Sequence, residues 1–177
     1  MKVELKANGK TVQVEMTEEQ AKILGLVEER SRTGYERVEV EETYYLVDVD
    51  DEITNMKHNG QLDRDCYDVG NYYSNKTIAE NNARADRLLR HLRQWQAQND
   101  EPISVEDWNN ESKKKWFIIY SYSSEEMYAE YYYIMRLPNT IYFATKEKAE
   151  EAIEVFKDEL IWYFTEYVQR LDEVQND

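Results

Sequence analysis

Apolar and charged residues alternate on both sides of Asn8-Gly9 near the start of the chain. Asn-Gly is the strongest short hairpin signal, because both residues tolerate a positive φ. Thr17, with Gln20 three residues later, forms a capping-box pattern that predicts the start of a helix. Residues 1–40 are therefore expected to form an N-terminal ββα unit.

A pattern of residues occurs twice in the rest of the chain. Residues 72–80 (YYSNKTIAE) and 142–150 (YFATKEKAE) share an aromatic pair, a helix-capping position and an Ala-Glu ending. Repeated sequence units predict repeated structural units. We therefore expect a first β-β-α repeat at residues 41–100 and, after a connector, a second β-β-β-α repeat within residues 101–177.

The periodicity of apolar residues places the elements of these repeats. Strands rich in aromatic and β-branched residues are expected at 43–49, 116–122, 127–135 and 140–143. Helices are expected from about residue 76 to 98, where apolar residues recur at helical spacing, and from Thr145 to about residue 171. Because the strands are joined locally, the fold class predicted is α+β, with antiparallel β-hairpins each followed by a helix and the helices on one face.

The composition favours a folded and strongly acidic protein. The chain has 177 residues, of which 41% are hydrophobic and 13% aromatic, enough to build a core. Its net charge of −15 repels phosphate backbones, so we expect a basic protein partner and no direct contact with nucleic acid. The single cysteine and the lack of any long apolar run predict a cytoplasmic protein without a membrane partner.

No motif for catalysis or metal binding stands out in the sequence. The carboxylates of residues 48–52 lack the glycine of a calcium loop, so we interpret them as a solvated hairpin end. The acidic stretch 63–68 is similarly interpreted as a polar turn. His58 and His91 do not cluster with Cys66 as zinc ligands do, and nothing local marks that thiol as activated by His91. We expect no enzyme, no catalytic residue, no metal and no cofactor.

Three surfaces are candidates for binding a partner. The first is an acidic face of the last helix, with Glu147, Glu150, Glu151, Glu154 and Asp158. The second is one face of the 127–135 strand, where tyrosines either pack in the core or meet a partner beside two carboxylates, namely Tyr128, Tyr132, Glu126 and Glu130. The third is a basic row that either pairs with acidic neighbours or contacts an acidic partner or second subunit, namely Arg84, Arg87, Arg90 and Arg93.

The sequence around the first aromatic pair carries a resemblance. Residues 68–73 (DVGNYY), followed by Lys76, Ala79 and Glu80, resemble a motif of small uncharacterised proteins from phages and prophages of Gram-positive bacteria. Residues 139–150 resemble the same motif more loosely. The resemblance implies a mobile-element origin and a structural role for the motif, and it brings no reaction and no catalytic residue.

These observations favour an interaction protein over an enzyme. We expect an acidic phage or mobile-element accessory protein that binds and inhibits a basic host protein. Nucleic-acid mimicry against a defence nuclease, an anti-CRISPR or anti-restriction activity, is one form of this, because the channels of such enzymes are positively charged. The alternatives are a phage structural or assembly protein, and a binder that sequesters a small anionic ligand. The sequence leaves the oligomeric state open.

Overall fold

The computed structural model describes residues 2–7, 10–24 and 32–173 and combines helices with antiparallel hairpins. The chain divides into two compact units, residues 1–33 and 34–177. The first unit therefore ends earlier than the boundary expected at residue 40. Both expected repeats lie in the second unit.

The first unit has the elements that its sequence predicts. They are β1 (Lys2–Ala7), β2 (Lys10–Glu15) and α1 (Glu18–Ile23), with β1 antiparallel to β2. The Thr17 N–H donates to Gln20 Oε1 at 3.0 Å, and the Gln20 N–H donates to Thr17 Oγ1 at 3.2 Å. These two bonds confirm the capping box, because each side chain satisfies a backbone group of the first turn. The turn expected at residues 8 and 9 lies outside the described residues.

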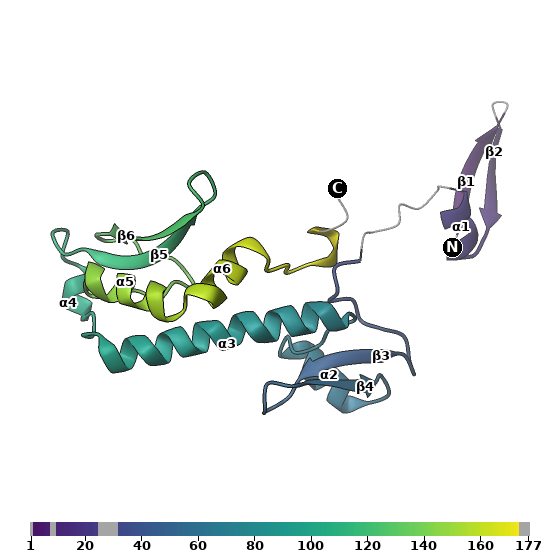
Figure 1. Ribbon diagram of the computed structural model, residues 1–177. Helices are drawn as coiled ribbons and strands as arrows, with labels where there is room; N and C mark the ends of the chain where they lie inside the picture. Colours follow the sequence, from purple (N-terminus) through teal and green to yellow (C-terminus); the bar gives the residue numbers. More distant parts are fainter. Residues whose placement is uncertain (1, 8–9, 25–31, 174–177) are drawn as a thin grey trace. The chain divides into compact units, whose positions relative to one another are not determined.

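The second unit is organised around one long helix (Figure 1). Its elements are β3 (Thr43–Val47), β4 (Ile53–Lys57), α2 (Gln61–Asp68), α3 (Lys76–Asn99), α4 (Val105–Trp108), β5 (Lys115–Ser121), β6 (Glu126–Tyr132), α5 (Lys146–Val155), α6 (Lys157–Thr165) and the 3₁₀ turn η1 (Leu171–Glu173). The β3–β4 hairpin, α5 and α6 all pack on α3, and the β5–β6 hairpin packs on α5. Helix α3 therefore connects two separate hairpins.

Each hairpin contributes to its own apolar cluster along α3. Near the start of α3, the buried residues Tyr73, Ile78 and Ala79 pack with Tyr45, Val47 and Ile53. Farther along, the larger cluster consists of Leu88, Leu92, Ala129, Phe143, Ala149, Ala152 and Leu160. Apolar residues three, four and seven apart on one helix face supply the α3 side of both clusters, as the sequence predicts.

The two copies of the aromatic pair adopt the same local backbone structure. The Tyr73 backbone exchanges two hydrogen bonds with Tyr45, at 2.8 and 2.9 Å. The Phe143 backbone exchanges two with Trp116, at 2.7 and 3.0 Å. In both places the aromatic residue is buried and forms a single antiparallel bridge to the first strand of the preceding hairpin.

The helices that follow the two aromatic pairs also begin alike. Asn75 caps α3 by accepting the N–H of Ile78 at 3.1 Å, and Thr145 caps α5 by accepting the N–H of Lys148 at 3.2 Å. A tandem repeat of the complete β-β-α units nevertheless stays a prediction. Helix α2 stands between β4 and the first aromatic pair, whereas residues 133–141 form bends and turns, and α3 is continuous where α5 and α6 are separate helices.

Several sequence expectations are corrected by the structure. Residues 140–143 do not form a third strand, because Asn139 has a φ of 58° and only Phe143 bridges to Trp116. The 127–135 strand ends at Tyr132. The helices do not all cover one hairpin face: Tyr44, on the face of β3 opposite Tyr45, hydrogen-bonds Asp63 of α2, a helix that the sequence reading took for a turn.

Candidate functional site

The carboxylates expected to bind a partner gather around an indole ring. Four of the five line a shallow hollow of about 520 Å³ together with Trp95 and Val155, and they are Glu147, Glu150, Glu151 and Glu154. We call these six residues the acidic groove. Trp95 belongs to α3 and the other five residues to α5, so the packing of α5 on α3 creates the groove.

The position of the Trp95 indole in the groove is fixed by packing against Phe143. Trp95 is half-buried and its ring lies edge-on to Phe143, with centroids 6.2 Å apart. Phe143 is fully buried, so the aromatic pair of the second copy supports this ring. The sequence reading treated Trp95 only as part of an apolar helix stripe, and no local signal placed it beside the α5 carboxylates.

Two of the four groove carboxylates are paired within their own helix. Lys146 Nζ lies 2.8 Å from Glu150 Oε1, and Lys148 Nζ lies 2.6 Å from Glu151 Oε2. The side chains of both pairs are a third to a half exposed, and such surface pairs contribute little to stability. Among the residues that the structure describes, Glu147 and Glu154 form no salt bridge within 4 Å.

Asp158, the fifth expected acidic residue, lies apart from the groove. The helix expected to run from residue 145 to 171 ends at Val155, and α6 begins at Lys157. Phe156, between them, has φ −109° and ψ 18°, and its ring packs against the larger apolar cluster. Asp158 is therefore an exposed residue of the first turn of α6 and does not line the groove.

The basic row of α3 is largely paired with carboxylates of the same unit. Arg84 donates to Glu159 at 2.9 and 3.0 Å, and its guanidinium also lies 3.9 Å from the centre of the Trp162 ring. Arg87 and Arg90 both donate to Asp51, at the tip of the β3–β4 hairpin. These contacts agree with the interpretation of an exposed face that pairs with acidic neighbours.

Two of the paired arginines, Arg84 and Arg87, line a second hollow of about 420 Å³. Its lining has two arginines, three carboxylates and one histidine, namely Arg84, Arg87, Asp51, Glu80, Glu159 and His91. Hydrogen bonds from Arg84 lower the pKa of Glu159, and those from Arg87, then Arg90, lower the pKa of Asp51. Both acids are therefore held as carboxylates, which would repel the small anionic ligand considered from the sequence. Arg93 does not line this hollow.

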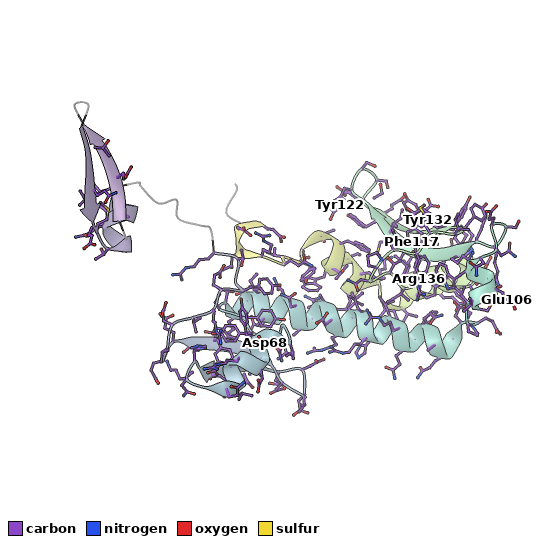
Figure 2. The ribbon with its side chains drawn as sticks, turned by 180° about the vertical axis from the view of Figure 1, so that it is seen from behind. Asp68, Glu106, Phe117, Tyr122, Tyr132 and Arg136 are labelled. Carbon is purple, nitrogen blue, oxygen red and sulfur yellow. The ribbon has the colours of Figure 1, made fainter. Side chains whose placement is uncertain are left out.

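The tyrosine strand divides as strand alternation predicts. Met127 and Ala129 face the larger apolar cluster, and Tyr131 on the same face lies against Trp116 with ring centroids 4.8 Å apart. Tyr128 and Tyr132 lie on the opposite face, where Tyr132 packs against Phe117 at 4.9 Å (Figure 2). Tyr128 keeps 43% of its surface exposed. One tyrosine on that face is therefore partly covered and the other is available to a partner.

The two carboxylates beside these tyrosines differ in their surroundings. Glu126 is exposed at the start of β6. Glu130 accepts the N–H of the next residue, Tyr131, at 2.9 Å. Glu130 therefore satisfies one backbone donor of its own strand.

The sequence did not predict that two polar residues, Lys115 and Asp63, are buried. Lys115 is fully buried, and its Nζ donates to the carbonyls of Asn110, at 3.0 Å, and Tyr133. Asp63 accepts from the Tyr44 hydroxyl at 2.8 Å and from two backbone N–H groups at the start of α2, those of Asn59 and Gly60. These partners compensate for the loss of water, so both residues have structural roles. Asp63, three residues after the N-cap residue Gly60, was the local sign of the start of α2.

No cluster of potential metal ligands forms among the described residues. Within them, no group of three or more His, Cys, Asp or Glu side chains could hold a metal ion. Cys66 lies in α2, whereas His91 lines the hollow on α3, so the two residues considered as a nucleophile and base belong to different sites.

In the described part of the chain, no helix has both the length and the apolar character needed to cross a membrane.

Comparisons with known proteins do not identify either hollow. No protein family, no curated protein and no solved structure matches the chain.

Proposed function

We propose that this protein acts by binding a lysine- or arginine-rich segment of a basic protein in the acidic groove. The observation that carries the proposal is the position of Trp95 among four glutamates on an exposed surface. An aromatic ring surrounded by carboxylates offers a basic side chain two favourable contacts in one place.

The chemistry of lysine and arginine fits both parts of the groove. Their aliphatic stems pack on apolar surface, while their charged heads favour the face of an indole or a carboxylate. Glu147 and Glu154 offer charge without disrupting an existing salt bridge. Glu150 and Glu151 require exchange of an exposed pair, which costs little because water and flexible side chains surround it.

The spacing of the carboxylates supports mimicry of a short stretch of nucleic acid. Four carboxylates between residues 147 and 154 span about 10.5 Å of helix, with successive rises of about 4.5, 1.5 and 4.5 Å and a mean interval of roughly 3.5 Å. One strand of B-DNA has a phosphate about every 3.4 Å along its axis. Lys146 and Lys148 offset two of the four charges, so the groove suits one or two basic side chains better than a long channel.

Inhibition of a host nucleic-acid-binding protein is the biological form that we propose for this contact. The net charge of −15 would steer the protein toward a basic surface. Occupation of such a surface by the groove would then exclude a nucleic-acid backbone. A defence nuclease is one partner of this chemistry, which joins the proposal to the anti-CRISPR or anti-restriction activity expected from the sequence.

The test compares two variants with the same net charge. The groove variant carries Glu147→Gln, Glu150→Gln, Glu151→Gln and Glu154→Gln, and the control carries Glu101→Gln, Glu106→Gln, Glu111→Gln and Glu125→Gln, all at exposed positions. Each changes the net charge from −15 to −11. Fluorescently labelled octa-arginine and octa-lysine peptides serve as probes, and anisotropy gives the dissociation constant at low and high salt.

We expect the groove variant to bind at least tenfold more weakly than the control variant. Binding to the wild type should also weaken as salt rises, because exposed charges are screened. Equal losses of affinity in the two variants would mean that net charge alone drives binding, and would refute a specific role of the groove. An affinity that is indifferent to salt and to both variants would reject charge-driven binding altogether.

A further inference from the structure

One edge of the β5–β6 hairpin is unpaired in the described part of the chain. Trp116 of β5 exchanges its backbone hydrogen bonds with Phe143, so the residues on either side of it, Lys115 and Phe117, direct theirs toward β6. Their partners in β6 are Tyr132 and Glu130. Because backbone direction alternates along a strand, the remaining residues of β6 direct their N–H and C=O groups away from β5.

The outward-directed residues are Met127, Ala129 and Tyr131, and no strand of the described residues pairs with them. Within the described part of the chain, the one hydrogen bond to these outward-directed backbone groups is that of the Tyr131 N–H to the Glu130 carboxylate, at 2.9 Å. A row of unpaired backbone groups on an edge strand is a template for another strand. Rotation of the Glu130 side chain would free this N–H.

We propose that a second copy of this chain occupies this edge, with β6 antiparallel to β6 and the two-fold axis at Ala129. In this register Met127 lies opposite the partner's Tyr131, and Tyr128 lies opposite the partner's Glu130. The three outward-directed residues of each strand then face one another, so all of their N–H and C=O groups are paired. The β5–β6 hairpins of the two copies then form one four-stranded sheet. This proposal does not depend on the acidic groove.

The positions of the two glutamates select this register over its neighbours. Like charges directly opposite each other destabilise a strand pair. A shift by two residues in one direction places Glu130 opposite the partner's Glu130. A shift in the other direction places Glu126 opposite the partner's Glu130, twice. A shift by one residue sets outward-directed groups against inward-directed ones. Among the registers within two residues of it, the register centred on Ala129 is therefore the one that avoids both faults, and it pairs all three outward-directed residues of each strand.

The side chains that meet in this register are compatible. Met127 would meet a tyrosine ring, a favourable contact for a thioether. Tyr128, which is 43% exposed, can direct its hydroxyl to the partner's Glu130. The pair at each end, Glu126 with the partner's Tyr132, also combines an acceptor with a hydroxyl.

The surroundings of the edge also favour a second copy. Residues 113–136 contain four basic and three acidic residues, so this hairpin lacks the excess negative charge of the chain as a whole. Exposed apolar side chains follow β6 directly, at Ile134, Met135 and Leu137. In the antiparallel pair, residues 133–135 come beside the 122–125 turn of the partner, which exposes Tyr122. These contacts extend the apolar area beyond the strands themselves.

The test is the molar mass of the purified full chain by sedimentation velocity and light scattering from about 1 to 200 μM. We expect the mass to rise toward twice 21.3 kDa. Two substitutions at one exposed position make the register testable. Tyr128→Glu places a carboxylate opposite the partner's Glu130, and Tyr128→Lys places an ammonium there. Glutamate should weaken dimerisation at least tenfold, whereas lysine should preserve it.

Far-UV circular dichroism and the urea midpoint establish that both variants are folded. A covalent readout uses Cys66→Ser with Tyr128→Cys and Glu130→Cys, which brings thiols together across the two-fold axis and gives a disulfide-linked dimer on oxidation. A wild-type chain that stays monomeric at 200 μM would overturn the proposal. Equal effects of the two Tyr128 substitutions, or a dimer that does not cross-link, would overturn the proposed register.

Discussion

Replacement of Phe143 by alanine tests the packing on which both the second hairpin and the acidic groove depend. The Phe143 ring is 0% exposed and packs among Leu88, Leu92 and Leu160 of the larger apolar cluster. It also supports the Trp95 ring at 6.2 Å. The substitution leaves the backbone hydrogen bonds to Trp116 in place, so the expected loss comes from the side chain alone.

The magnitude follows from complete burial. Transfer of a phenylalanine side chain out of water stabilises a protein by about 1.5–3 kcal/mol. The cavity left by truncation adds to that loss, because tightly packed neighbours relax only in part, and Phe→Ala in a core costs about 3–5 kcal/mol. For a chain of this size each kcal/mol corresponds to roughly 2–4 °C in melting temperature.

Urea denaturation followed by circular dichroism measures this loss, with Phe143→Leu and Val49→Ala as controls. Leucine keeps most of the buried volume and should cost much less than alanine. Val49 is 99% exposed, so its truncation should change the free energy of unfolding by less than about 0.5 kcal/mol. A loss below about 1 kcal/mol for Phe143→Ala, or a loss equal to that of Val49→Ala, would refute the assigned position of the ring.

Three further predictions concern the helix starts and the absence of a metal. Asn75→Ala and Thr145→Ala should each cost about 1 kcal/mol in urea denaturation, and a cost at only one site would contradict their equivalent capping roles. Hydrogen bonds from Gly60, then Tyr44, hold the pKa of Asp63 below its usual 3.8 despite burial, so its stabilisation is present above that pH and lost as pH falls through the lowered pKa. The difference in unfolding free energy between wild type and Asp63→Asn should therefore shrink below about pH 4, and a constant difference from pH 7 to 2 would refute this. EDTA should leave the melting temperature unchanged, whereas a large decrease would reveal a bound metal ion.

Local signals predicted the helix starts and the strand alternation well. The capping box at Thr17 and the caps at Asn75 and Thr145 are confirmed, because each depends on hydrogen bonds within four residues of chain. The 24-residue helix α3 matches its predicted range closely, since its apolar stripe follows one period throughout. Alternation along β6 also placed Tyr128 and Tyr132 on one face and Tyr131 on the other.

Local signals failed where distant residues decide the conformation. Nothing between Glu154 and Asp158 is a helix breaker, yet the last helix is interrupted at Phe156, whose ring packs into the larger apolar cluster. Helix α2 was not predicted because its N-cap residue is Gly60. The local sign of its start was Asp63 in the first turn, which accepts the backbone N–H groups of Asn59 and Gly60.

The sequence by itself determined the acidic charge, the paired aromatic motifs and the faces of the main elements, since composition and short-range periodicity carry that information. Only the tertiary structure decided which side chains meet. Trp95 and Glu150 are 55 residues apart in the chain and line one groove because α5 packs on α3. Likewise, the outward direction of Ala129 depends on Phe143 taking the far side of β5, a hydrogen-bonding choice made between segments that are distant in sequence.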